Sequence, residues 1–443
     1  MDADIDRLRR RAALRTGFRR SRSTPGGRVH WRALVLAACV STWLGPAMAQ
    51  AAGASPAIDL AHYWISPGER AALDIFKQAF VEGKGAWSES VSDDYEFMKR
   101  DVVGRIAVGL APSALWWGAE DRGFTKLLDF LRPIDQIAPA GWAQHLNATA
   151  MELIGAPGKA RYLPITIHNE NWSWYNARVY RKLGLPLPLP VTWAQFLRQA
   201  PVLAAEGIVP LAVSDQPWTV RLLWTTIVAG VAGRELYLQL LVNANTEALD
   251  DPRMQRALRT FLELRRWSSR PGTAPTWADA TAQVREGRAA MQVMGDWARA
   301  EFPLVDVSAQ SDYVCAPAPN AAGLFIAAVD MFAFPSASTN LAGQALLARV
   351  VLRPDVQVRF ANQKGATPVL RNLDAQQLHP CARQTYALLQ SPNAVVQSHR
   401  ATLFEGARVR VMDAVDKHWR TSSTTLSDFT ADLRSAFQRG DRE

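Results

Sequence analysis

The alternation of apolar and polar positions predicts a chain in which strands and helices follow one another. Residues Ile58 to Ser66 ("IDLAHYWIS") form a largely apolar run of strand length. In the next segment Ala72, Ile75, Phe76 and Phe80 recur at helical spacing, which predicts an amphipathic helix. The same alternation continues through most of the chain and gives way to helical patterns after about residue 380. This order of elements is typical of an α/β fold.

One segment, "WADATAQVREGRAAMQVMGDWARAEF", predicts a helix, a short strand and a second helix. Asp279 is the expected N-cap of the first helix, and Gly287 is its expected C-terminal stop. After the strand, Gly295 is expected to turn the chain and Asp296 to cap a helix that begins at Trp297. Trp297 would then lie at a strand end, where open α/β sheets bind ligands, although ordinary core packing is the alternative for this ring.

A second segment, "YRKLGLPLPLPVTWAQFLRQA", predicts a helix that ends at Gly184 and a proline-rich linker over residues 186–190. Thr192 is the expected cap of the helix that begins at Trp193.

Residues 1–49 have the pattern of an export signal and are set apart from the fold. They are rich in arginine, contain the apolar run "ALVLAACVSTWLG", and end in Ala47-Met48-Ala49, the small-x-small form of a cleavage site. Cleavage after Ala49 and a periplasmic location are therefore expected. The alternative is a lipid on Cys39 of "LAAC", although only residues 33–38 precede it as an apolar stretch. Beyond residue 49 no apolar run reaches membrane-spanning length.

The leader also explains the charge of the chain. The whole sequence has a formal net charge of +9. Ten arginines and three aspartates lie in residues 1–49, so seven of these charges belong to the leader and the remainder is near +2. The basic character is thus a targeting feature, and no nucleic-acid partner is expected.

If Cys39 leaves with the leader, Cys315 and Cys381 remain. Two cysteines in an exported protein favour a disulfide, which would stabilise the fold by roughly 4 kcal/mol on the loop-entropy model. Two buried free thiols are the alternative. The chain has no C-x-x-C spacing, so redox catalysis and a structural zinc site both lack their usual pattern.

Several segments in the same order along the chain resemble the extracellular solute-binding proteins of sugar ABC importers, above all the glucose/mannose-binding branch. They cover nearly all of the sequence after residue 49 and read "YWISPGE", "YLPITIHNENWSWYNARVYRKLGL", "DQPWT", "GRAAMQVMGDWARAEF", "DYVCAPAP", "AAVDMFAFP" and "FANQKGATPVLRNLD".

The resemblance implies two α/β lobes that close over a sugar in the cleft between them, joined by a hinge of about three strands. Lobe one would hold residues 50–167 and 325–372, and lobe two residues 168–324 and 373–443. The implied partners are a sugar ligand and the membrane permease of an ABC transporter. A monomer without cofactor or metal is expected.

A sugar offers hydroxyls that need hydrogen bonds and C–H faces that stack on aromatic rings, so its site needs both kinds of side chain. The resemblance places Trp64 as a stacking surface and Glu69 as a hydroxyl acceptor, whereas a favourable first-turn acid is the alternative for Glu69. Trp218, which follows a proline in an apparent polar loop, is expected as a second aromatic wall. Asp330 lies in an apolar strand run, where a charge needs a ligand or an ion-pair partner.

Three further positions complete the expected ligand set. Lys364 precedes a glycine that lets the backbone approach a ligand, and His399 aligns with a sugar-facing histidine of the family. A satisfied core histidine is the alternative for His399. Trp116 and Gly118 stand where the glucose branch has a glutamine and a histidine, which implies an altered sugar, a modified one or weakened binding.

Two other classes of function stay open at this point. A glycoside hydrolase would use paired carboxylates, for which Glu69 with Asp330 or Asp93 with Asp94 are the candidates. No G-x-S-x-G, H-E-x-x-H or phosphate-loop motif is present, and no enzymatic activity is expected. A receptor for another solute, or a sensor or scaffold protein with an altered site, is the second alternative.

Overall fold

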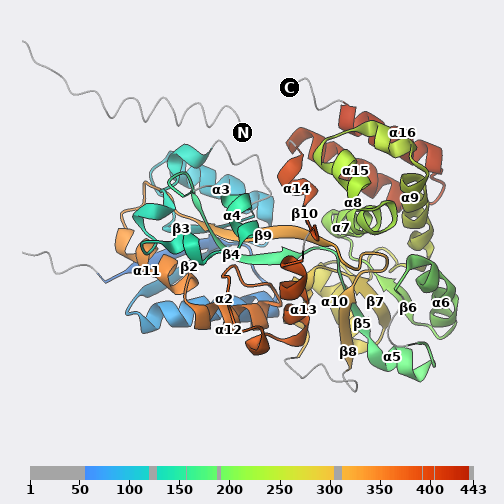
Figure 1. Cartoon of the computed structure of the whole chain (residues 1–443), viewed down its shortest axis with the longest axis horizontal. Coiled ribbons are helices and arrows are strands. Elements are labelled where there is room, and N and C mark those ends of the chain that lie inside the picture. Colours follow the sequence, from blue (N-terminus) through green and yellow to red (C-terminus); the bar gives the residue numbers. More distant parts are fainter. Residues whose placement is uncertain are drawn as a thin grey trace, which may run out of the picture.

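The computed structural model describes residues 55–118, 127–155, 157–186, 191–303, 312–391, 393–403 and 405–438. The expected leader, the cleavage at Ala49, the lipid site at Cys39 and most of the proline-rich linker lie outside these residues. Two sheets, each with its own helices, form two lobes side by side (Figure 1).

The first sheet has six strands in the order β10-β9-β3-β1-β2, with β4 paired to β9. β1 pairs in parallel with β2 and β3, whereas β9 runs antiparallel to β3 and β4. Its strands are β1 (Ala57–His62), β2 (Ala86–Val91), β3 (Ala114–Gly118), β4 (Tyr162–Asn169), β9 (Phe325–Ala333) and β10 (Val395–Gln397).

In the part of the chain that the structure describes, the first lobe contains this sheet and the α-helices α2 (Pro67–Glu82), α3 (Tyr95–Ala107), α4 (Ala148–Ile154), α11 (Leu341–Val351) and α12 (Pro354–Lys364). The predicted first helix is confirmed, and the predicted first strand (58–66) is confirmed as far as His62, where β1 ends. Helix α2 begins with a capping box, in which Ser66 accepts from the Glu69 N–H and Glu69 accepts from the Ser66 N–H. The rings of Phe76 in α2 and Phe360 in α12 stack with centroids 4.3 Å apart, so the two helices form one layer.

The second sheet has four strands in the order β6-β7-β5-β8. They are β5 (Trp172–Asn176), β6 (Val209–Ala212), β7 (Ala289–Val293) and β8 (Tyr313–Pro317). The second lobe adds to this sheet α5 (Ala177–Lys182), α6 (Trp193–Ala205), α7 (Pro217–Ile227), α8 (Arg234–Tyr237), α9 (Pro252–Leu264), α10 (Trp277–Glu286), the 3₁₀ turn η8 (Asp296–Glu301), α14 (His399–Thr402), α15 (Glu405–Arg420) and α16 (Leu426–Gln438).

Each sheet lies within its own large hydrophobic core. One core gathers side chains of β1, β3, β4 and β9 with α2, α3, α11 and α12. The other gathers β5, β6, β7 and β8 with α6, α7, α9, α15 and α16. Because the two cores are separate, the chain has the α/β, two-lobed architecture that the sequence predicts.

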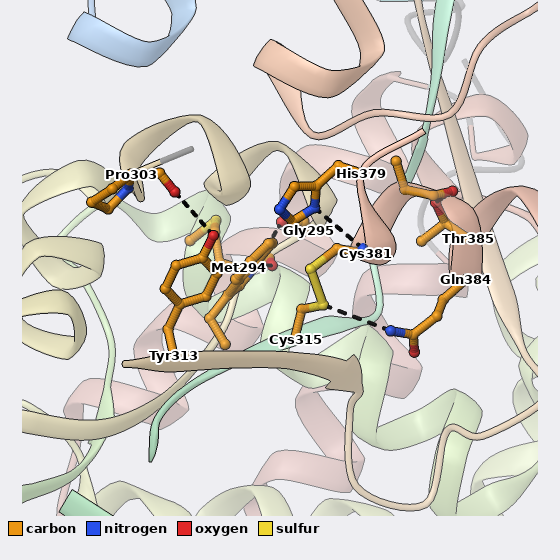
Figure 2. The surroundings of a disulfide bond; sticks show 11 residues. Met294, Gly295, Pro303, Tyr313, Cys315, His379, Cys381, Gln384 and Thr385 are labelled. Carbon is orange, nitrogen blue, oxygen red and sulfur yellow. Dashed lines mark hydrogen bonds between the residues drawn. A yellow bond between two sulfur atoms is a disulfide. The ribbon is translucent and has the colours of Figure 1, made fainter. Parts of the chain in front are cut away.

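Helix α13 (Pro380–Leu389) joins the two lobes. Its Ala382 and Tyr386 pack on Val358 and Ala361 of α12 in the first lobe. Its Cys381 forms a disulfide with Cys315 of β8 in the second lobe, with Cα atoms 6.0 Å apart (Figure 2). The expected disulfide is confirmed, and it links α13 covalently to β8 of the second sheet.

Two of the predicted N-caps are wrong and one is confirmed. Thr276, and not Asp279, caps α10; Asp279 is the third helical residue and completes a capping box with Thr276. A Thr-x-x-Asp pattern satisfies two helix-end N–H groups at once, which explains the shift. Thr192 caps α6 as predicted.

Asp296 does not cap a helix that begins at Trp297. The turn η8 starts at Asp296 itself, has no side-chain cap, and leaves this carboxylate to other partners. Trp218 lies in the first turn of α7 and not in a loop, because Pro217 is well suited to the first helical position.

Candidate functional site

A buried cluster of three ionisable side chains lies where the lobes meet. His168, near the end of β4, has its Nδ1 2.6 Å from Oδ1 of Asp296 in η8 and its Nε2 3.1 Å from Oδ2 of Asp330 in β9. The other oxygen of Asp296 accepts the N–H of Asn169 at 2.9 Å. The cluster therefore connects both lobes through charged hydrogen bonds.

The electrostatics of this cluster favour a positively charged ring. Burial lowers the pKa of His168, but the carboxylates of Asp296 and Asp330 outweigh burial and raise the pKa to about 9. An imidazolium between two carboxylates donates a hydrogen bond to each of them, and its charge offsets one of the two negative charges.

Lys364, at the end of α12, adds a buried positive charge to this junction. Its Nζ lies 3.7 Å from Oε1 of Glu69 and 5.2 Å from the centroid of the Trp64 ring. Burial raises the pKa of Asp296, and the charges of His168 and Lys364 oppose this rise. Burial raises the pKa of Glu69, and the charge of Lys364 opposes this rise. The structure thus brings Trp64, Glu69 and Lys364 together.

The two expected tryptophans of the first lobe are packed against other rings. Trp64 is 1% exposed and lies 6.0 Å from the rings of both Trp116 and Phe360. Trp116 is 2% exposed and meets Tyr63 edge-on at 4.7 Å. In this structure both indoles belong to the core of the first lobe.

The aromatic residues of the second lobe are more open. Trp218 and Trp297 are both partly exposed, and their ring centroids lie 6.3 Å apart. The Trp297 ring in turn meets His168 edge-on at 5.3 Å. These contacts connect Trp218 through Trp297 and His168 to Asp330.

His399 lies in a second polar cluster. It is fully buried at the start of α14, and Arg221 of α7 donates to its Nε2 at 3.3 Å. Ser398 beside it donates to Glu170 at 3.1 Å. His399 is therefore a buried histidine whose Nε2 contacts Arg221, and it lies next to the chain segment that connects β4 to β5.

The lobes touch beside the cluster. The N–H of Gly68 in α2 donates to Oε1 of Glu301 in η8 at 3.2 Å, and a Cβ at Gly68 would lie 2.4 Å from the carbonyl oxygen of Ala300. A cavity of about 380 Å³ opens next to this contact. It is lined from both lobes by Pro67, Gly68, Ala278, Asp279, Ala282, Arg285, Ala300, Glu301 and Gln363. None of the seven expected ligand residues lines it.

Sequence reasoning missed His168 and misassigned Asp296. The signal for His168 was a histidine within the apolar run "LPITIH", at the place where the chain was expected to cross between lobes. Nothing local to "GDWA" indicates that Asp296 would bond a residue 128 positions away.

None of the helices described here combines the length and apolarity needed to cross a bilayer. Within the same ranges, no group of three or more His, Cys, Asp or Glu residues is arranged to hold a metal ion.

The chain is similar to known proteins over most of its length. The family described as "bacterial extracellular solute-binding protein" matches residues 105–358. The "Probable sugar-binding periplasmic protein" of Brucella suis is 28% identical over 343 residues, which are 76% of this chain and 80% of that relative. The protein of the same name from Rhizobium meliloti is 28% identical over 346 residues, 76% of this chain and 81% of the relative.

Solved structures share the fold. The bacterial solute receptor AcbH, described as having an exclusive preference for β-D-galactopyranose, superposes with a TM-score of 0.72 at 17% identity over 86% of this chain and 98% of AcbH. Maltose-bound MalE3 of T. maritima gives 0.69 at 15% identity over 86% and 99%. At these identities the likeness establishes the two-lobed fold alone.

Proposed function

Because the chain belongs to the bacterial extracellular solute-binding proteins, we propose that it is the sugar receptor of an ABC importer. It captures a glucose- or mannose-like monosaccharide, or a related carbohydrate, between its lobes and delivers it to a membrane permease. The names of the relatives and the sugars of the structural neighbours support a carbohydrate. The family name describes binding, which fits a protein without enzymatic activity.

The observation that carries this proposal is the polar cluster at the junction of the lobes. Asp330 has a side chain that is 11% exposed, and its partner His168 contacts the partly exposed indole of Trp297 in the second lobe. A carboxylate accepts sugar hydroxyls, and indole faces stack on sugar C–H groups. Within this proposal Trp64, Glu69, Trp116, Trp218, Asp330, Lys364 and His399 remain the ligand set.

The division of the chain follows the same proposal. Lobe one comprises residues 50–167 and 325–372, and lobe two residues 168–324 and 373–443. The separate hydrophobic cores support this division for most of the chain, whereas β10 (Val395–Gln397) pairs with β9 in the sheet of the first lobe. Closure about the connecting segments, secretion to the periplasm and a monomeric state complete the proposed receptor.

A binding panel tests the proposal. Isothermal titration with monosaccharides and small oligosaccharides is expected to give at least one ligand with a micromolar Kd, about −8 kcal/mol. Asp330→Asn should weaken that ligand at least tenfold, whereas the exposed Asp93→Asn should leave it unchanged. A panel without any binding sugar, or an Asp330→Asn variant that binds like the parent, contradicts the proposed site.

A further inference from the structure

The ring of His168 is held at both nitrogens by carboxylates. Nδ1 faces Asp296 at 2.6 Å and Nε2 faces Asp330 at 3.1 Å. A neutral imidazole donates from one nitrogen only, and an ionised carboxylate only accepts. Both contacts can be hydrogen bonds to ionised carboxylates only when both ring nitrogens carry a proton.

One end of this chain of contacts is anchored to the backbone. Asp296 accepts from the ring of His168 through Oδ1 and from the N–H of Asn169 through Oδ2. It is 1% exposed, so its orientation is fixed by protein groups and not by water. Asp296 therefore sets the position of the histidine ring.

Asp330 lies at the other end of this chain of contacts. Asp330 uses Oδ2 for His168, and among the described residues its Oδ1 accepts no hydrogen bond. Its cross-strand neighbour on β3 is Gly118, which contributes no side chain beside it. Asp330 is also the most exposed of the three side chains, at 11% against 4% for His168 and 1% for Asp296.

We propose that His168 is a positioning residue, which holds Oδ2 of Asp330 so that Oδ1 points at the hydroxyls of the bound sugar. The inference rests on the proposed function, because it needs Asp330 to contact the ligand. His168 itself acts through Asp330 and does not touch the sugar. The doubly protonated ring fixes the rotamer of Asp330 before the sugar binds. Less rotamer entropy of Asp330 is therefore lost on binding.

Binding measurements on four variants test this relay. His168→Gln is expected to weaken the best sugar of the panel about tenfold, and Asp330→Asn at least as much. The double variant should bind like Asp330→Asn alone, because His168 has no effect once its target is altered. His145→Gln, an exposed histidine of the first lobe, is the control and should bind like the parent.

The outcomes separate the two proposals. Unchanged binding in His168→Gln, or losses that add in the double variant, overturn the positioning role while the sugar site stands. Unchanged binding in Asp330→Asn overturns the proposed site, and the positioning role fails with it. The same holds if the parent protein binds no sugar at all.

The pH dependence of the sugar affinity distinguishes a positioning role of His168 from a purely structural role. The groups around the ring are Asp296 and Asp330 in contact, with Lys364 and Glu69 behind them. Because the pKa of His168 is raised to about 9, affinity should hold up to about pH 8 and fall as pH rises through 9. His168→Gln should lack this fall.

Nitrogen NMR of the parent protein keeps the inference testable if His168→Gln does not fold. Both ring nitrogens of His168 are expected to be protonated at pH 7.5. A ring with one unprotonated nitrogen at that pH overturns the proposal.

Discussion

At the junction of the lobes, the effect of a single substitution on stability depends on the buried charges that the residue contacts. Lys364 is 2% exposed, and its Nζ lies 3.7 Å from the carboxylate of Glu69. Glu69 also closes the capping box of α2 with Ser66. One side chain therefore has two roles, which a single substitution can separate.

Glu69→Gln tests the ion pair without removing the cap, because glutamine also completes a capping box. We expect a loss of about 3 kcal/mol in the free energy of unfolding, since the buried ammonium of Lys364 loses a counter-charge. Urea denaturation at pH 7 measures it.

The matched control is Glu263→Gln, an acid 40% exposed that pairs with the 64% exposed Arg266 near the end of α9. This exposed carboxylate should contribute less than about 1 kcal/mol. Equal losses in the two variants would show that the burial of Glu69 is not what matters.

The stability of the protein should also depend on His168. Its folded pKa of about 9 lies above the ordinary value of 6.5, so its contribution is complete below pH 6.5 and is lost as pH rises through 9. Urea midpoints at intervals from pH 6 to 9 should therefore fall, and His168→Gln should flatten the curve. A parent curve that is already flat contradicts an imidazolium at this position.

Single residues also show what the sequence could and could not predict. Asp330 was expected to need a partner because it interrupts an apolar strand, and it has one in His168. The identity of that partner depends on a strand pairing of residues 162 positions apart. Local patterns cannot supply that information, and for the same reason Asp296 was taken for a helix cap.

At the scale of elements, the packing of a helix against its neighbours determines whether a glycine within it is required. Helix α11 approaches β1 so closely that a Cβ at Gly343 would lie 1.8 Å from the carbonyl oxygen of Ala57. In helix α3, a Cβ at Gly104 would meet nothing within 4 Å. Both glycines lie inside helices, and only the first is required by its neighbours.

Alanine at these two positions should act in opposite directions. Gly343→Ala is expected to lower the free energy of unfolding by about 1–3 kcal/mol through overpacking. Gly104→Ala should raise it by about 0.5–1 kcal/mol, because alanine favours the helix. Thermal unfolding of both variants decides, and a stabilised Gly343→Ala would show that α11 can move away from β1.

The elements themselves were largely predictable. The first strand, helix α2 and the cap at Thr192 follow from periodicity and capping chemistry that act over a few residues. The cap of α10 was misplaced by three residues, because a Thr-x-x-Asp box contains two good capping residues. The closeness of α11 to β1 depends on tertiary packing, which no local pattern records.

The whole molecule is two cores connected by a few segments, and the disulfide strengthens one of these. Cys315 of β8 and Cys381 of α13 are 66 residues apart in sequence. Since α13 also packs on α12, the bond joins a helix that contacts the first lobe to the sheet of the second.

Removing this bond should destabilise the protein by about 4 kcal/mol on the loop-entropy model. The double variant Cys315→Ala, Cys381→Ala should therefore unfold at lower urea concentration than the oxidised parent. A reducing agent should shift the parent toward the variant and leave the variant unchanged. Identical midpoints for the oxidised and reduced parent would contradict the expectation.

The contact between Gly68 and Ala300 leaves no space for a methyl group where the lobes meet. An alanine at position 68 would therefore obstruct the approach of the two halves without altering any charge. Such a protein would keep the polar groups that bind a solute, but its lobes could not approach as closely as those of the parent. Measuring solute binding and solute transport separately for this variant and the parent would distinguish recognition of the solute from its transfer to the transporter.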